Sequence, residues 1–146
     1  MKNPSLKCLV LCTALVAGAA PAWADDVLPL PPEKQFGAVS YTSGGIPDEQ
    51  LPAVRQARAG YPLVLELFQK TGQKNQYVAD VQVRLTNAKG EVVLDAASEG
   101  PFMLLRTPPG TYKVEATFQG KTLTQQGVAV AAKGSKRVVF VFPPAP

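Results

Sequence analysis

The sequence predicts an all-β protein, an antiparallel β-sandwich of about seven strands with one short helix before the main strands. After residue 60, apolar and polar residues alternate, which is typical of strands with one buried and one solvent face. Turns rich in glycine and proline separate these stretches at short intervals. Strands do not alternate with long helices along the chain, so a nucleotide-binding α/β fold is not expected.

The first 24 residues have the layout of a secretory signal peptide. Two lysines precede an apolar run over residues 8–20, and Ala22 and Ala24 form a small-x-small cleavage site before Asp25. We therefore expect cleavage between Ala24 and Asp25. The mature protein would then be periplasmic or secreted.

Cleavage would leave a chain without cysteine or histidine, because Cys8 and Cys12 both lie in the leader. Zinc and copper sites and centres that need a cysteine or histidine are then not expected. Lipid attachment at Cys12 is disfavoured, because Leu11 precedes it where bacterial lipoprotein signals carry a small residue. We expect no cofactor and no metal. A second long apolar segment is missing from the sequence, so we expect no membrane span in the mature chain.

Charge is nearly balanced in the mature chain. The full sequence has 15 Lys and Arg against 11 Asp and Glu, and two of the lysines belong to the leader. The basic residues are scattered, apart from Lys133, Lys136 and Arg137 around a Gly-Ser turn. Nucleic-acid binders usually gather such residues on one face, so a nucleic-acid partner is not expected.

The N-terminal part of the mature chain predicts an arm, a strand and a helix. Residues 25–35 contain three prolines and predict an extended arm. Residues 36–42 predict a short strand, which a turn at residues 43–45 ends. Residues 47–59 predict the one helix, because proline and two acidic residues stand at its start and a glycine follows its end.

Residues 61–142 predict the sandwich, and residues 143–146 are a proline-rich tail that ends it. Tyr61 is expected on the core face together with Leu63. The final strand is apolar on both faces, so one face should enter the core and the helix should cover the other. We expect the strands at residues 61–68, 79–86, 91–95, 102–106, 111–119, 121–126, 128–132 and 137–142.

A longer pattern connects three of these strands. The alternating strand 79–86 is followed by a turn at Lys89-Gly90, by strand 91–94 and by Pro108-Pro109-Gly110-Thr111-Tyr112. This pattern resembles the carboxypeptidase regulatory-like, or transthyretin-like, family of small β-sandwiches. The resemblance implies that Tyr112 packs inward from a central strand, and it implies no peptidase activity. The chain departs from the family at residues 100–102, where an Asp-x-x-Gly-x-Phe segment is common.

Several residues have catalytic or metal-binding side chains, and each also has a plain structural interpretation. Asp95, Ser98 and Glu99 offer oxygen ligands for calcium, but the spacing of a calcium loop is absent, so a solvated turn is favoured. Two carboxylates at a suitable separation could act as acid and base in a glycoside hydrolase. The candidates for such a pair are Glu66, Asp80, Glu99 and Glu115, of which Asp80 and Glu115 are expected on solvent faces.

Two further patterns favour turns over sites. Ser135 and Lys136 could form a Ser-Lys nucleophile, but they stand at a hairpin between small and basic neighbours. Residues 43–45 precede a helix as an anion-binding nest would, yet the lysine and the longer glycine pattern of a phosphate loop are missing. We expect turns at both places.

A polar strand expected at a sheet edge offers a way to bind a partner strand, and equally suits a protected edge. Its exposed candidates are Lys121, Thr122, Thr124 and Gln126. We therefore expect a secreted or periplasmic, non-catalytic β-sandwich that acts through protein or cell-envelope contacts. A carbohydrate or small-ligand module is the alternative, marked by aromatics outside the main strands, and a carboxylate hydrolase ranks third. Those aromatics are Phe36, Tyr41 and Tyr77.

Overall fold

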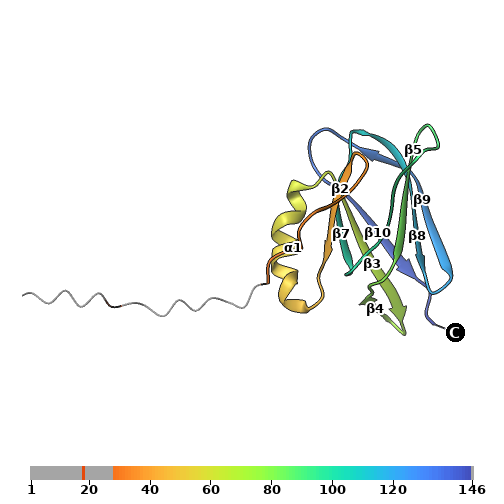
Figure 1. The fold of residues 1–146 in the computed structure, drawn as a ribbon. Coiled ribbons are helices and arrows are strands. Elements are labelled where there is room, and N and C mark those ends of the chain that lie inside the picture. The colour runs from red at the N-terminus through yellow and green to blue at the C-terminus, as the bar shows by residue number, and fades with distance from the viewer. Residues whose placement is uncertain (1–17, 19–27, 146) are drawn as a thin grey trace, which may run out of the picture.

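The computed structural model describes residues 18 and 28–145, and residues 34–142 form ten strands and one short helical segment (Figure 1). The strands and helices are, in chain order, β1 (Lys34–Phe36), β2 (Val39–Gly44), η1 (Asp48–Gln50), α1 (Leu51–Ala57), η2 (Arg58–Gly60), β3 (Leu63–Thr71), β4 (Lys74–Tyr77), β5 (Gln82–Asn87), β6 (Val92–Ala97), β7 (Phe102–Arg106), β8 (Gly110–Phe118), β9 (Lys121–Val130) and β10 (Lys136–Phe142).

The strands form two sheets that pack face to face. The first sheet has the order β1-β2-β7-β3-β10, with β4 paired to the end of β3, and the second has the order β6-β5-β8-β9. Neighbouring strands are antiparallel except β3 and β10, which run parallel along the whole length of β10. The expected all-β sandwich with one short helix is confirmed, but it has ten strands instead of about seven, and one of its pairings is parallel although an antiparallel sandwich was expected.

The core fills the space between the sheets and follows the alternation in the sequence. Leu63, Leu65 and Leu67 of β3 point inward and are fully buried, as are Val83 and Leu85 of β5. Burial of side chains of this size supplies most of the driving force for folding, at about 25 cal/mol per Å² of apolar surface. Tyr112 also packs into this core, as the resemblance implied, and its hydroxyl donates a hydrogen bond to the carbonyl of Pro108.

Three parts of the strand prediction were wrong. The strand expected at residues 36–42 is a hairpin of β1 and β2, because Gly37 adopts a left-handed φ of 58° and reverses the chain. Residues 74–77 form β4 because they pair with the end of β3. The two strands expected at residues 121–132 are one strand, β9, with a bulge at Gly127 opposite Lys113.

The helical segment runs from Asp48 to Gly60 as predicted, with 3-10 turns on both sides of α1. It covers the outer face of the first sheet, where Val64 and Leu104 pack against Ala57. Tyr61 belongs to this outer cluster, so its expected place on the core face was wrong, because the strand alternation begins only at Leu63.

The helix covers β3 and β7 more than it covers β10. On the outer face of β10, Val139 is half-buried and Val141 is exposed. The expectation that the helix would cover the final strand is therefore met only in part.

The end of the N-terminal arm is tied to the sandwich by Glu33. This carboxylate accepts hydrogen bonds from the hydroxyl of Tyr61 at 2.6 Å and from Nε of Arg106 at 2.9 Å. The guanidinium of Arg106 also lies over the Tyr61 ring, 4.3 Å from its centroid. The arm thereby connects to both the helix end and β7.

The predicted cleavage site at Ala22, Ala24 and Asp25 lies outside the described residues, as does the whole leader except Gly18. Within the part of the chain that the structure describes, none of the helices has the length and apolarity needed to cross a bilayer.

Replacing Gly100 by alanine should destabilise the protein by about 2 kcal/mol, because its Cβ would stand 2.3 Å from the carbonyl oxygen of Gly44 and force backbone apart. Gly60 is the matched control, since a Cβ there meets nothing within 4 Å and its φ lies outside the left-handed region. G60A should stay within about 1 kcal/mol of the native chain. Urea unfolding measures the free energy of unfolding of both variants. Equal losses in G100A and G60A would contradict the close approach of residues 44 and 100.

The Glu33 contacts predict a pH dependence. Hydrogen bonds from Tyr61 and Arg106 lower the pKa of Glu33 below its ordinary value of 4.5. The stabilisation is therefore complete above pH 4.5 and is lost as the pH falls through the lowered pKa. E33Q should melt at a lower temperature than the native chain at pH 7, with a difference that closes towards pH 3. E91Q, which removes a carboxylate from the β5–β6 turn, should not show this pattern.

Candidate functional site

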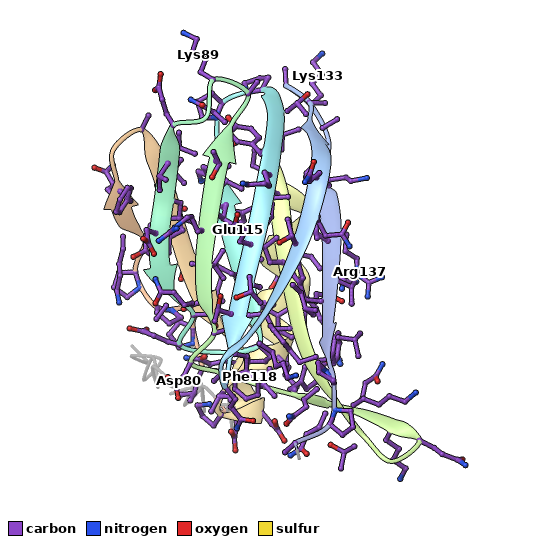
Figure 2. All side chains as sticks on the ribbon, turned by 90° about the vertical axis from the view of Figure 1, so that its right-hand side faces the viewer. Asp80, Lys89, Glu115, Phe118, Lys133 and Arg137 are labelled. Carbon is purple, nitrogen blue, oxygen red and sulfur yellow. The ribbon has the colours of Figure 1, made fainter. Side chains whose placement is uncertain are left out.

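The four candidate carboxylates do not converge. Glu66 lies on the outer face of the first sheet, whereas Glu115 lies on the outer face of the second, between inward-facing Val114 and Ala116. Figure 2 shows Glu115 in the middle of its strand and Asp80 at the lower end of the sandwich. Glu115 pairs with Lys113 at 3.0 Å, within its own strand. The arrangement therefore offers no acid and base facing one another across a common hollow.

Glu66 is the one deeply buried carboxylate among these four. Its side chain is 3% exposed, accepts a hydrogen bond from Arg137 of β10 and lies 3.7 Å from Nη1 of Arg58 in η2. A buried charge is tolerated when it is paired and hydrogen-bonded. Two guanidinium groups share this single carboxylate, so the cluster carries a net positive charge.

The residues that were weighed as calcium ligands are held by other contacts. Asp95 accepts a hydrogen bond from Arg84, and Glu99 pairs with Lys34 at 2.6 Å. The hydroxyl oxygen of Ser98 accepts a bond from a buried backbone N–H. No group of three or more potential ligand residues comes together within the described residues.

The other two small motifs are structural as well. Ser43 and Gly44 belong to β2, so the expected turn at residues 43–45 is shorter than predicted, and the N–H of Gly45 donates to the side chain of Gln50. An anion at this point would have to displace that amide oxygen. Ser135 donates to the carbonyl of Arg58 at 3.2 Å, which ties the loop before β10 to the end of the helical segment.

The three candidate aromatics lie at different places. Phe36 and Tyr41 belong to the β1–β2 hairpin at one edge of the first sheet. Tyr77 belongs to β4, where it stacks on Phe68 at 4.9 Å between ring centroids. Among the described residues, the hollows at Tyr112 and at Arg58 are not lined by two tyrosines.

A hollow of about 380 Å³ lies at the end of the sandwich where three turns meet. It is bounded by Val39, by the β5–β6 turn around Lys89 and by the β7–β8 turn at Pro108 and Pro109. The hydroxyl of Tyr112, which lines it, is already bonded to Pro108. The hollow thus offers mainly an apolar surface.

In the part of the chain that the structure describes, one side of the sandwich ends in two strands that have no strand paired on their outer side. β9 is the last strand of the second sheet and β10 the last of the first, and the two lie next to each other (Figure 2). A groove of about 220 Å³ runs between residues 125–128 of β9 and residues 136–139 of β10. The predicted edge position of Lys121, Thr122, Thr124 and Gln126 is thereby confirmed, whereas the edge position of β10 was not foreseen.

The backbone of β10 can be assigned in detail. The N–H of Lys136 donates to the carbonyl of Pro62, and Lys136 is in register with Leu63. Since alternate residues of a strand direct their backbone groups to opposite sides, Arg137, Val139 and Val141 direct their N–H and C=O groups away from β3. Within residues 28–145, β3 is the only strand paired with β10.

This side of the molecule is also basic. Strands β3, β4, β9 and β10 contain a single acidic residue, Glu66, which is already shared by two arginines. The fold brings Arg58 next to Arg137 although they are 79 positions apart in the sequence. The scattered appearance of the basic residues in the sequence therefore hid a local cluster, of which only the group at residues 133–137 was visible. The basic residues of this side are Arg58, Lys70, Lys74, Lys121, Lys133, Lys136 and Arg137.

Compared with models of known protein families, the chain has no match. A search of curated proteins likewise finds no significant match. The resemblance to transthyretin-like domains thus remains a prediction from the sequence pattern.

Proposed function

We propose that the protein is an exported, non-catalytic β-sandwich that binds another protein of the cell envelope. The observation that carries this proposal is the open, basic side formed by β9 and β10. Unpaired edge strands bind extended segments of other proteins through main-chain hydrogen bonds. A binding role through such an edge needs neither histidine nor cysteine, which the proposed mature chain lacks.

The state of the polar side chains supports binding rather than catalysis. The carboxylates of Glu33, Glu66, Asp95, Glu99 and Glu115 all have basic partners that hold them in place. General acid–base catalysis depends on groups that are free to exchange a proton with a substrate. The alternative of a sugar-binding module is supported less well, because its aromatic candidates lie apart on the first sheet.

Export can be tested through Trp23, the only tryptophan of the chain. If cleavage follows Ala24, protein purified from the periplasm or medium will show tyrosine emission without tryptophan emission, and its intact mass will correspond to residues 25–146. Blocking the site with Ala24→Leu should retain the leader and the tryptophan signal. A tryptophan signal in the exported native protein would contradict the proposed cleavage site.

Partner binding can be tested by capturing the tagged protein with envelope proteins from the cells that express it. The native chain should retain one defined protein, identified by mass spectrometry. K133E should reduce its yield about tenfold, since it reverses a charge beside β10. K89E is the matched control, because it makes the same charge change at the β5–β6 turn, and it should retain the partner. Figure 2 shows these two lysines at the same end of the sandwich on opposite sides. Recovery of background proteins alone would overturn the proposed function.

A further inference from the structure

We propose that the outer edge of β10 is the docking strand, and that it binds an extended acidic segment of the partner protein by strand addition. On the outer face of the first sheet, the segment would place an acidic residue beside Arg137 and apolar residues beside Val139 and Val141. The inference rests on the proposed function and specifies its site and the chemistry of the bound segment.

The backbone of β10 supplies the first requirement. Arg137, Val139 and Val141 direct three N–H and three C=O groups to the outer edge of β10, where an added strand can pair with them. The same three residues direct their side chains to the outer face of the sheet. A bound segment therefore meets these three side chains at every second residue, because side chains of a strand alternate between its faces.

The side chains next to this edge continue as an apolar strip. Val141 is in register with Phe68 of β3, and Phe68 is in register with Tyr77 of β4. Phe68 and Tyr77 stack, while Val141 and Tyr77 stay 39% and 36% exposed. Apolar residues on the added strand would extend this row and bury the exposed edge of Val141.

The charge at the other end of β10 selects an acidic residue. Arg137 shares the Glu66 carboxylate with Arg58, and the side chain of Arg137 is 62% exposed. A guanidinium has five N–H donors, so Arg137 retains donors for a second carboxylate. Lys133 and Lys136 add positive charge close by, around the hollow at the start of β10.

The same charges disfavour a second copy of this chain as the occupant. Two antiparallel β10 strands would bring Lys136 and Arg137 of one copy to the C-terminal end of β10 in the other. Lys121 lies at that end, where it lines a hollow with Phe142. Like charges at both ends of the edge repel an identical strand and attract an acidic one.

The side chains on the inner face of an added strand can also be accommodated. Its alternate side chains would enter the groove between β9 and β10, which is lined by Gln125, Gln126 and Val128 on one side and by Lys136 and Val138 on the other. Short polar side chains such as threonine suit a groove of about 220 Å³ with this lining.

A synthetic peptide tests the inference directly. The acetylated and amidated peptide Thr-Glu-Thr-Val-Thr-Val-Thr carries the predicted pattern and would be added to the full mature protein labelled with ¹⁵N. We expect the amide signals of Arg137, Val139 and Val141 to shift and their hydrogen exchange to slow. A peptide with Lys in place of Glu should bind about tenfold more weakly. A peptide of the same composition with the alternation broken should not bind.

Matched variants of the protein locate the site. V141K should weaken the peptide about tenfold, because it replaces the apolar contact with the peptide's second valine by a charge that binding would have to desolvate. V92K is the control, since Val92 is an exposed apolar residue of β6, the edge strand on the opposite side of the second sheet. It should leave the peptide affinity unchanged. If V141K fails to fold, K136E provides the second test, and it should weaken the peptide by reversing a charge at the edge.

The outcomes separate this inference from the proposed function. Peptide-induced shifts confined to β9, an absence of binding, or dimers through β10 would overturn the inference. If V141K captures the envelope partner as well as the native chain does, the protein binds its partner elsewhere. The proposed function then stands without this site. If a single-stranded oligonucleotide binds more tightly than the peptide at 150 mM salt, the inference is overturned and the ligand of this edge is a nucleic acid. Failure of both peptide binding and envelope capture would overturn both proposals.

Discussion

The parallel pairing of β3 with β10 is the contact on which the rest of the molecule depends. β3 is buried on both faces, with Leu65 in the core and Val64 under the helix, so it needs a neighbour on each side. A parallel neighbour cannot follow through a short hairpin. Strands β4 to β9 therefore lie between β3 and β10 in the sequence, and the last strand of the chain returns to pair with β3. Because β10 ends the first sheet, the pairing that completes the core also creates an open edge beside β9.

Glu66 links this pairing to the position of the helix. Its carboxylate lies on the outer face of β3, where Arg137 of β10 donates to it and Arg58 of the helical segment lies 3.7 Å away. A shift of one residue would turn Arg137 towards the core and leave Glu66 with one partner. An apolar residue at position 66 could fill the same space, and buried pairs add little net stability. The glutamate instead disfavours a one-residue shift of β10 along β3.

Local patterns predicted the strands whose faces differ in polarity. Strand β5 alternates buried Val83 and Leu85 with exposed polar residues, and its bounds lie close to those expected from the sequence. Strand β4 has no such pattern, because pairing with β3 and the stacking of Tyr77 on Phe68 hold it in place. The position of Tyr61 was predicted wrongly, because the alternation of β3 was extended back to residue 61, before the strand begins at Leu63. These errors arise where contacts distant in sequence determine the structure.

Half of the candidate site could be predicted from the sequence. The polar residues of β9 marked one edge, but the apolar faces of β10 suggested a covered strand, and only its long-range pairing shows that it is an edge. Soluble proteins protect such edges with charge, and lysines serve well in this role. Here the protection comes from Lys121 at one end and from Lys136 and Arg137 at the other. Charge that repels a second copy does not repel an acidic strand, so the same residues keep the protein from self-pairing and leave the edge open to a partner.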